Sequence, residues 1–146
     1  MQITARTQPP SGMQDHRNLR VWKHAHQLAV RVRCETADFQ AMGFVSLQSQ
    51  MGRAAESIVF NIAEGCGATS QREFARFLGI AIKSSFELEA QCELAKDYDA
   101  LSDSVWKELD AALVSTRRML FALRKKVLLS PHGKRMAGTS PTTVNP

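Results

Sequence analysis

The fold of this chain is organised around Gln50 to Gly65, which reads QMGRAAESIVFNIAEG. Apolar residues recur every three or four positions through it and just before it, which predicts a helix with one buried face. The residues of this face are Leu47, Met51, Ala54, Ile58 and Ile62. We expect Gly65 to take a positive φ just past the end of this helix. The pattern is typical of an inner helix of a bundle.

A polar stripe runs beside the apolar face and continues onto the next helix. Its residues are Arg53, Ser57, Asn61, Glu64 and Glu87. We expect these groups to hydrogen-bond one another and fix the packing of the helices, and a chemical role is the alternative. Glu64 and Glu87 lie near the edges of apolar stripes, so they are candidates for buried carboxylates that need a partner.

Composition indicates one globular domain without a membrane span. The chain has 146 residues, of which 44% are hydrophobic and 23% charged, and no apolar run approaches the roughly 18 residues of a spanning helix. The N-terminus lacks the apolar core of a signal peptide. Three unpaired cysteines then predict reduced thiols in the cytoplasm. The net charge of +5 favours acidic partners such as nucleic acid.

Helix signals divide the chain into an arm, a bundle and a tail. We expect a flexible arm at 1–17, a bundle at 18–128 and a disordered tail at 129–146. The predicted helix caps are Asn18, Ser46, Ser70 and Ser102, and Glu73 completes a capping box with Ser70. Four apolar stripes with short connections predict an all-α, antiparallel up-down-up-down four-helix bundle.

The third predicted helix carries more apolar surface than one bundle needs. Ile80, Ile82 and Phe86 lie off its main stripe. Such a surplus is typical of further helix packing or of contact between subunits. We therefore predict that these three residues lie in an oligomer interface.

The residues alone give little support for catalysis. His24 and His26 are two positions apart on a helix, so their side chains point in different directions and cannot chelate one metal ion. No phosphate-binding loop is present in the sequence. We predict no catalytic residue, metal or cofactor. An enzyme that uses Glu64, Glu87 or Cys66, which lies between two glycines in an expected exposed turn, is the less favoured alternative.

Basic residues on the first and fourth helices are candidates for contact with RNA. They are Arg20, Lys23, Arg31, Arg33, Arg117, Arg118, Arg124 and Lys125. In an antiparallel bundle the end of the fourth helix lies beside the start of the first. Arg20, Lys23, Arg124 and Lys125 are therefore expected to gather at one end and to contact phosphates without reading bases. The alternative is that these side chains only solvate the helices.

Several motifs resemble the four-helix-bundle family of 23S ribosomal RNA intervening-sequence proteins. They are Ser57–Gly65 (SIVFNIAEG) with Gln50 and Arg53–Ala55 before it, Leu19–Lys23 with Ala25 and His26, and Glu73–Leu78 followed by Ser84, Glu87, Leu88, Glu89 and Gln91. The resemblance covers about residues 17–127. The chain departs from it at Gly52, where a basic residue is usual, and at Lys83, where a small one is.

The resemblance implies a bacterial cytoplasmic protein that assembles as a ring-shaped homopentamer and has no enzymatic activity. Relatives include accessory proteins of diversity-generating retroelements, in which a basic ring engages RNA and the reverse transcriptase. We therefore expect a non-catalytic oligomer that binds RNA or a ribonucleoprotein through basic helix surfaces. The alternative is an oligomeric scaffold or protein-interaction module that binds no nucleic acid.

Overall fold

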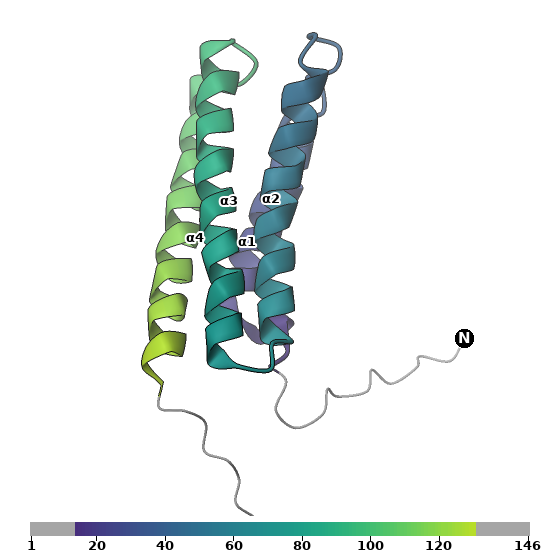
Figure 1. Ribbon diagram of the computed structural model, residues 1–146. Helices are drawn as coiled ribbons and strands as arrows, with labels where there is room; N and C mark the ends of the chain where they lie inside the picture. Colours follow the sequence, from purple (N-terminus) through teal and green to yellow (C-terminus); the bar gives the residue numbers. More distant parts are fainter. Residues whose placement is uncertain (1–13, 131–146) are drawn as a thin grey trace, which may run out of the picture.

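The computed structural model describes residues 14–130, which form a bundle of helices (Figure 1). In chain order the elements are η1 (His16–Asn18), α1 (Arg20–Glu35), α2 (Val45–Cys66), α3 (Gln71–Asp97) and α4 (Asp103–Leu129). No strand occurs within this range. The predicted all-α fold is confirmed. The expected arm and tail fall largely on residues 1–13 and 131–146, which lie outside the described residues.

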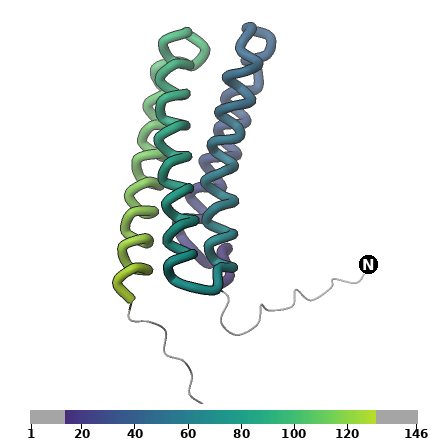
Figure 2. The backbone as a smooth tube through the Cα atoms, viewed as in Figure 1, coloured from purple at the N-terminus to yellow at the C-terminus, as the bar shows by residue number. Residues whose placement is uncertain are grey.

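Successive helices run in opposite directions and pack as neighbours (Figure 2). α1 packs on α2, α2 on α3 and α3 on α4, and α4 returns to contact α1. The short helix η1 contacts α1 and α2, so order begins before residue 18. Asp15 caps η1, and hydrogen bonds from Arg17 hold the pKa of its carboxyl at about 2.

The buried core follows the predicted apolar stripes. Met51, Ile58 and Ile62 of α2 are fully buried, and so are Leu78, Leu88, Leu109, Leu113 and Leu120 of α3 and α4. Phe39, in the connection after α1, closes the core at that end. Three hydroxyl residues also lie within the buried stripes. Thr36, Ser85 and Thr116 donate to the backbone oxygens of Val32, Ile82 and Ala112, so burial leaves no hydroxyl unpaired.

Two of the four predicted caps are confirmed. Ser70 Oγ accepts from the Glu73 backbone N–H, and Ser102 Oγ accepts from that of Val105. The predictions for Asn18 and Ser46 are wrong. α1 begins after Leu19 and α2 after Phe44, and neither helix has a side-chain cap at its start. Apolar residues occupy both N-cap positions instead, and Leu19 and Phe44 pack against the core.

The prediction that Gly65 takes a positive φ is wrong. Gly65 lies inside α2, which ends one residue later at Cys66, and the positive-φ glycine among residues 14–130 is Gly43 in the α1–α2 connection. A Cβ at Gly65 would lie 2.6 Å from Cδ2 of Phe74 and 3.2 Å from Cβ of Phe77. The absence of a side chain therefore lets α3 approach the end of α2 closely.

We expect Gly65→Ala to lower the free energy of unfolding by about 1–3 kcal/mol, because the added methyl group overlaps the packed Phe74 ring. Gly52→Ala is the matched control within α2, since its Cβ would meet only the flexible end of the Arg33 side chain. Urea unfolding followed by circular dichroism measures both. A Gly65→Ala protein as stable as Gly52→Ala would contradict the packing role.

Candidate nucleic-acid interface

Basic side chains gather at one end of the bundle. The start of α1, the α2–α3 turn and the end of α4 meet there, as Figure 1 shows. We call this the basic end, and its cations are Arg17, Arg20, Lys23, Arg72, Arg76, Arg124, Lys125 and Lys126. Three acidic residues share this end. Asp15 pairs with Arg17, and Glu73 accepts a hydrogen bond from the backbone N–H of Thr69. Glu64 is the third acidic residue of this end.

Acidic residues concentrate around the α1–α2 and α3–α4 connections. These connections lie at the opposite end of the bundle (Figure 1). We call this the acidic end, and its carboxylates are Glu35, Asp38, Glu93, Asp97, Asp99, Asp103 and Glu108. Lys96 and Lys107 also lie near this end, and Arg31 of α1 contacts two of its carboxylates, Glu35 and Glu108. The bundle is therefore polarised along its axis, and an anionic polymer would meet a favourable potential at the basic end.

Two of the predicted RNA-binding residues are engaged in ion pairs between helices. Arg31 of α1 pairs with Glu108 of α4, and it also lies 3.5 Å from Glu35. Arg33 contacts Glu56 of α2 at 2.7 Å. Both arginines lie away from the basic end and their charges are balanced locally, so they are weaker candidates for phosphate contact.

Arg117 has a structural environment. Its side chain is 12% exposed, and its guanidinium contacts Glu89 at 2.9 Å. Nε donates to the buried Ser85 hydroxyl, and the group lies 3.9 Å above the Phe86 ring. Hydrogen bonds, a carboxylate and an aromatic face together hold this arginine between α3 and α4.

The other five predicted cations have no carboxylate partner within residues 14–130. Arg20, Lys23, Arg118 and Lys125 make no ion pair there, and Arg124 donates from Nε to the backbone oxygen of Ala75 at 3.2 Å. Arg20, Lys23 and Lys125 are exposed at the basic end. The structure thus brings together the four residues expected at one end, and it leaves Arg118 further along α4.

Arg72 and Arg76 were missed by the sequence analysis. They belong to the first turns of α3 and line a hollow of about 600 Å³ together with Arg124 and Leu128 of α4. The antiparallel order already places the start of α3 beside the end of α4. In the sequence analysis, charges were compared only at the start of the first helix and the end of the fourth. Including the start of the third helix would have found both arginines.

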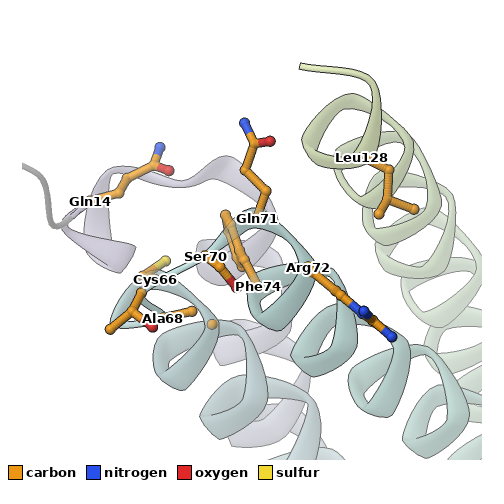
Figure 3. A pocket seen from close by; sticks show the side chains of 10 residues that line it. Gln14, Cys66, Ala68, Ser70, Gln71, Arg72, Phe74 and Leu128 are labelled. Carbon is orange, nitrogen blue, oxygen red and sulfur yellow. The ribbon is translucent and has the colours of Figure 1, made fainter. Parts of the chain in front are cut away.

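A second hollow of about 890 Å³ lies at the α2–α3 turn (Figure 3). Its wall is formed by Gln14, Gly65, Cys66, Ala68, Thr69, Ser70, Gln71, Arg72, Phe74 and Leu128. Only Arg72 contributes a charge. The start of α3 there is already capped by Ser70, so this hollow adds a neutral surface to the basic end.

Cys66, Glu64 and Glu87 do not form the group that an enzyme would need. Cys66 is buried as the last residue of α2, rather than exposed in a turn as expected, and burial raises the pKa of its thiol to about 11. Glu64 and Glu87 are exposed, so the expectation of buried carboxylates is wrong. Both glutamates lie at the edges of the apolar stripes, and these edges face solvent in the bundle.

Part of the predicted polar stripe is a hydrogen-bonded contact between α2 and α3. The hydroxyls of Ser57 and Ser84 lie 2.8 Å apart, and Asn61 Nδ2 donates to the oxygen atoms of Ser57. Glu87 accepts from Gln91 at 3.2 Å on α3. Arg53 is exposed and takes no part in this network.

The three residues predicted for an oligomer interface differ in exposure. Ile82 is 7% exposed and belongs to the core of one bundle, so its assignment to an exposed surface is wrong. Its burial depends on how α3 packs in the bundle, which a single-helix pattern does not indicate. Ile80 is partly buried, and Phe86 is 49% exposed.

Comparisons with known proteins agree with the fold. The family model described as 23S rRNA-intervening sequence protein matches residues 17–122. Among solved structures, a protein of unknown function from the S23 ribosomal protein family of Bacteroides thetaiotaomicron is similar, with 23% identity and a TM-score of 0.68. The match covers 72% of this chain and 95% of that one. No curated protein matches. Between residues 14 and 130, no helix has the length and apolar character needed to cross a membrane.

We expect Arg117→Ala to lower the free energy of unfolding by about 2 kcal/mol, since it leaves Glu89 and the Ser85 hydroxyl without their donor. Arg118→Ala removes the same charge from an exposed neighbouring position and should leave stability nearly unchanged. Chemical unfolding compares the two variants, and equal stability would show that Arg117 is not a structural residue.

One of the three cysteines should react readily with a thiol reagent. Cys34 is exposed, whereas burial raises the pKa of Cys66 to about 11 and that of Cys92 to about 12. Because the thiolate is the reactive form, we expect one thiol to be labelled quickly at neutral pH and two only on unfolding. Mass spectrometry of the labelled peptides identifies them, and rapid labelling of Cys66 would contradict its burial.

Proposed function

Because this chain belongs to the 23S rRNA-intervening sequence protein family, we propose that it is a non-catalytic, self-associating helical-bundle protein that binds RNA, alone or within a ribonucleoprotein. The proposed contact surface is the basic end. The resemblance to the family further suggests a homopentamer that acts in the bacterial cytoplasm, with a reverse transcriptase as one candidate protein partner.

The observation that carries this proposal is the set of unpaired cations at the basic end. Arg20 and Lys23 of α1, Arg72 and Arg76 of α3, and Lys125 of α4 have no carboxylate partner within residues 14–130. They come from three helices that the fold holds in fixed positions. Phosphate contact by such a surface releases counterions and needs no sequence-specific geometry.

The same arrangement supports recognition of the RNA backbone rather than of individual bases. Within residues 14–130 the basic end is formed by helix termini and a short turn, and no helix of that range projects from it as a reading element would into a groove. Binding through phosphates alone should tolerate many sequences and weaken steeply as salt rises.

We expect Lys23→Gln/Lys125→Gln to weaken binding to RNA at low salt and to reduce the steepness of the salt dependence. Each lost phosphate contact removes about 0.7–0.9 from the slope of log affinity against log salt, so two should remove about 1.5. Fluorescence anisotropy with a labelled RNA, titrated at several salt concentrations, measures the slope.

Lys96→Gln/Lys107→Gln is the matched control, because it removes the same two charges near the acidic end. Its affinity and slope should stay close to those of the wild-type protein. Equal losses in both variants would indicate a general charge effect and contradict a local surface. Absence of binding by the wild type at low salt would instead favour the scaffold that binds no nucleic acid.

A further inference from the structure

We infer that the outer face of α2 docks against the outer face of α3 and α4 of a second copy, with Phe60 of one copy beside Gly79 of the other. The α2 face comprises Arg53, Glu56, Phe60 and Glu64, and the α3–α4 face comprises Arg76, Gly79, Lys83, Phe86, Arg118 and Phe121. The inference rests on the self-association within the proposed function, and it names the two surfaces that would meet.

Aromatic side chains are exposed together on the α3–α4 face. Phe86 is 49% exposed and Phe121 is 50% exposed. The Arg117 guanidinium lies over the Phe86 ring, and Phe121 follows Arg117 by one turn on the same side of α4. The two rings thus belong to one surface. Large apolar side chains grouped in this way are typical of an interaction site.

Gly79 lies in the middle of α3 on this face without an internal reason. A glycine inside a helix costs about 1 kcal/mol relative to alanine. Gly65 accommodates Phe74 and Gly52 accommodates Arg33, whereas a Cβ at Gly79 would meet only Nε of Arg124, at the ordinary distance of 3.6 Å. Because a Cβ would fit at Gly79 without overlap, no contact within the chain requires glycine there, and its bare backbone suits the close approach of a group from outside the chain.

Phe60 is a suitable group to fill this space. It points outward from the middle of α2 and is 59% exposed, more than either phenylalanine of the α3–α4 face. Its neighbours one turn away on the α2 face are Glu56 and Glu64. A protruding ring on one face and a side-chain-free position on the other form a heterologous pair, in which each copy contributes a different surface.

The two faces lie at the same height along the bundle. The Ser57–Ser84 contact sets the register of α2 against α3, and the Arg117–Ser85 contact sets that of α4. With a helical rise of about 1.5 Å per residue, counting from these contacts places Phe60 within about 3 Å of Gly79 and Phe121 in height along the bundle axis. In a ring, copies are related by rotation about an axis parallel to the bundles, so neighbouring copies stand parallel and at the same height. Phe60 of one copy then lies at the height of Gly79 and Phe121 of the next.

Charges on the two faces are complementary in this same register. Glu64 of one copy comes level with Arg76 of the other, whereas Glu56 is already paired with Arg33 of its own chain. Further along the axis the signs are reversed: Arg53 of one copy comes level with the exposed Glu87 of the other, which follows Lys83 by one turn on α3. Agreement of both signs in one register favours a second copy over an RNA or an unrelated protein as the occupant.

Two single variants test the two faces separately. Phe60→Asp places a charge on the α2 face, and Gly79→Gln fills the space on the α3–α4 face. We expect each to weaken self-association by at least about tenfold, measured as molar mass by light scattering against concentration. Val30→Asp is the control, because Val30 is a 53% exposed residue of α1 outside both faces. It should assemble like the wild type.

Loss of folding cannot explain the expected result for Gly79→Gln. Glutamine favours a helix more than glycine does. The bundle of the Gly79→Gln variant should therefore gain thermal stability, while the molar mass measured by light scattering falls because self-association weakens. Phe60→Asp and Gly79→Gln, when mixed, should form a one-to-one dimer, since the first retains the α3–α4 face and the second retains Phe60. Larger assemblies should not form.

A wild-type protein that remains at its monomer mass of 16.2 kDa at micromolar concentration would overturn the inference. Unchanged assembly of Phe60→Asp or of Gly79→Gln would also overturn it, and so would a mixture that stays monomeric. RNA binding is measured separately by its salt dependence. An RNA-binding monomer would contradict this interface while the proposed contact with RNA stands.

Discussion

The close contact between α2 and α3 sets the register on which the rest of the molecule depends. The Ser57 and Ser84 hydroxyls meet at 2.8 Å in the middle of both helices, and Gly65 admits the Phe74 ring near their shared turn. A slip of one turn along this contact would separate the hydroxyls and place the Phe74 ring against a residue that has a side chain. The register in turn decides which charges lie at the same end, and so produces the polarised bundle.

The arginines of the bundle divide into two groups according to this geometry. Arg31, Arg33 and Arg117 join helices through Glu108, Glu56 and Glu89. Apart from Arg17, the arginines and lysines of the basic end have no such partner in the described part of the chain, because most carboxylates lie toward the other end. The arginines that join helices therefore lie away from the basic end, and the cations that could bind RNA lie at it. If copies stand parallel and level, as the two complementary faces suggest, their basic ends form one continuous surface.

Features encoded within one helix could be predicted from the sequence, and features that depend on a pair of helices could not. The apolar repeats gave the core, and Ser70 and Ser102 gave two helix starts, because a cap acts on the next turn of its own helix. The φ of Gly65 and the exposure of Ile82 were misjudged, and the contacts of Arg117 were missed, because each depends on packing between helices, such as Phe74 against Gly65 and Glu89 against Arg117. The gathering of Arg20, Lys23, Arg124 and Lys125 followed from antiparallel order alone.

Lysine footprinting tests the claim that RNA meets the basic end. The full-length protein is acetylated briefly with and without RNA, and the modification of each lysine is measured by mass spectrometry. RNA should protect Lys23, Lys125 and Lys126 while Lys96 and Lys107 are modified at an unchanged rate. Protection of Lys96 and Lys107, or equal protection of all five lysines, would contradict an RNA site at the basic end.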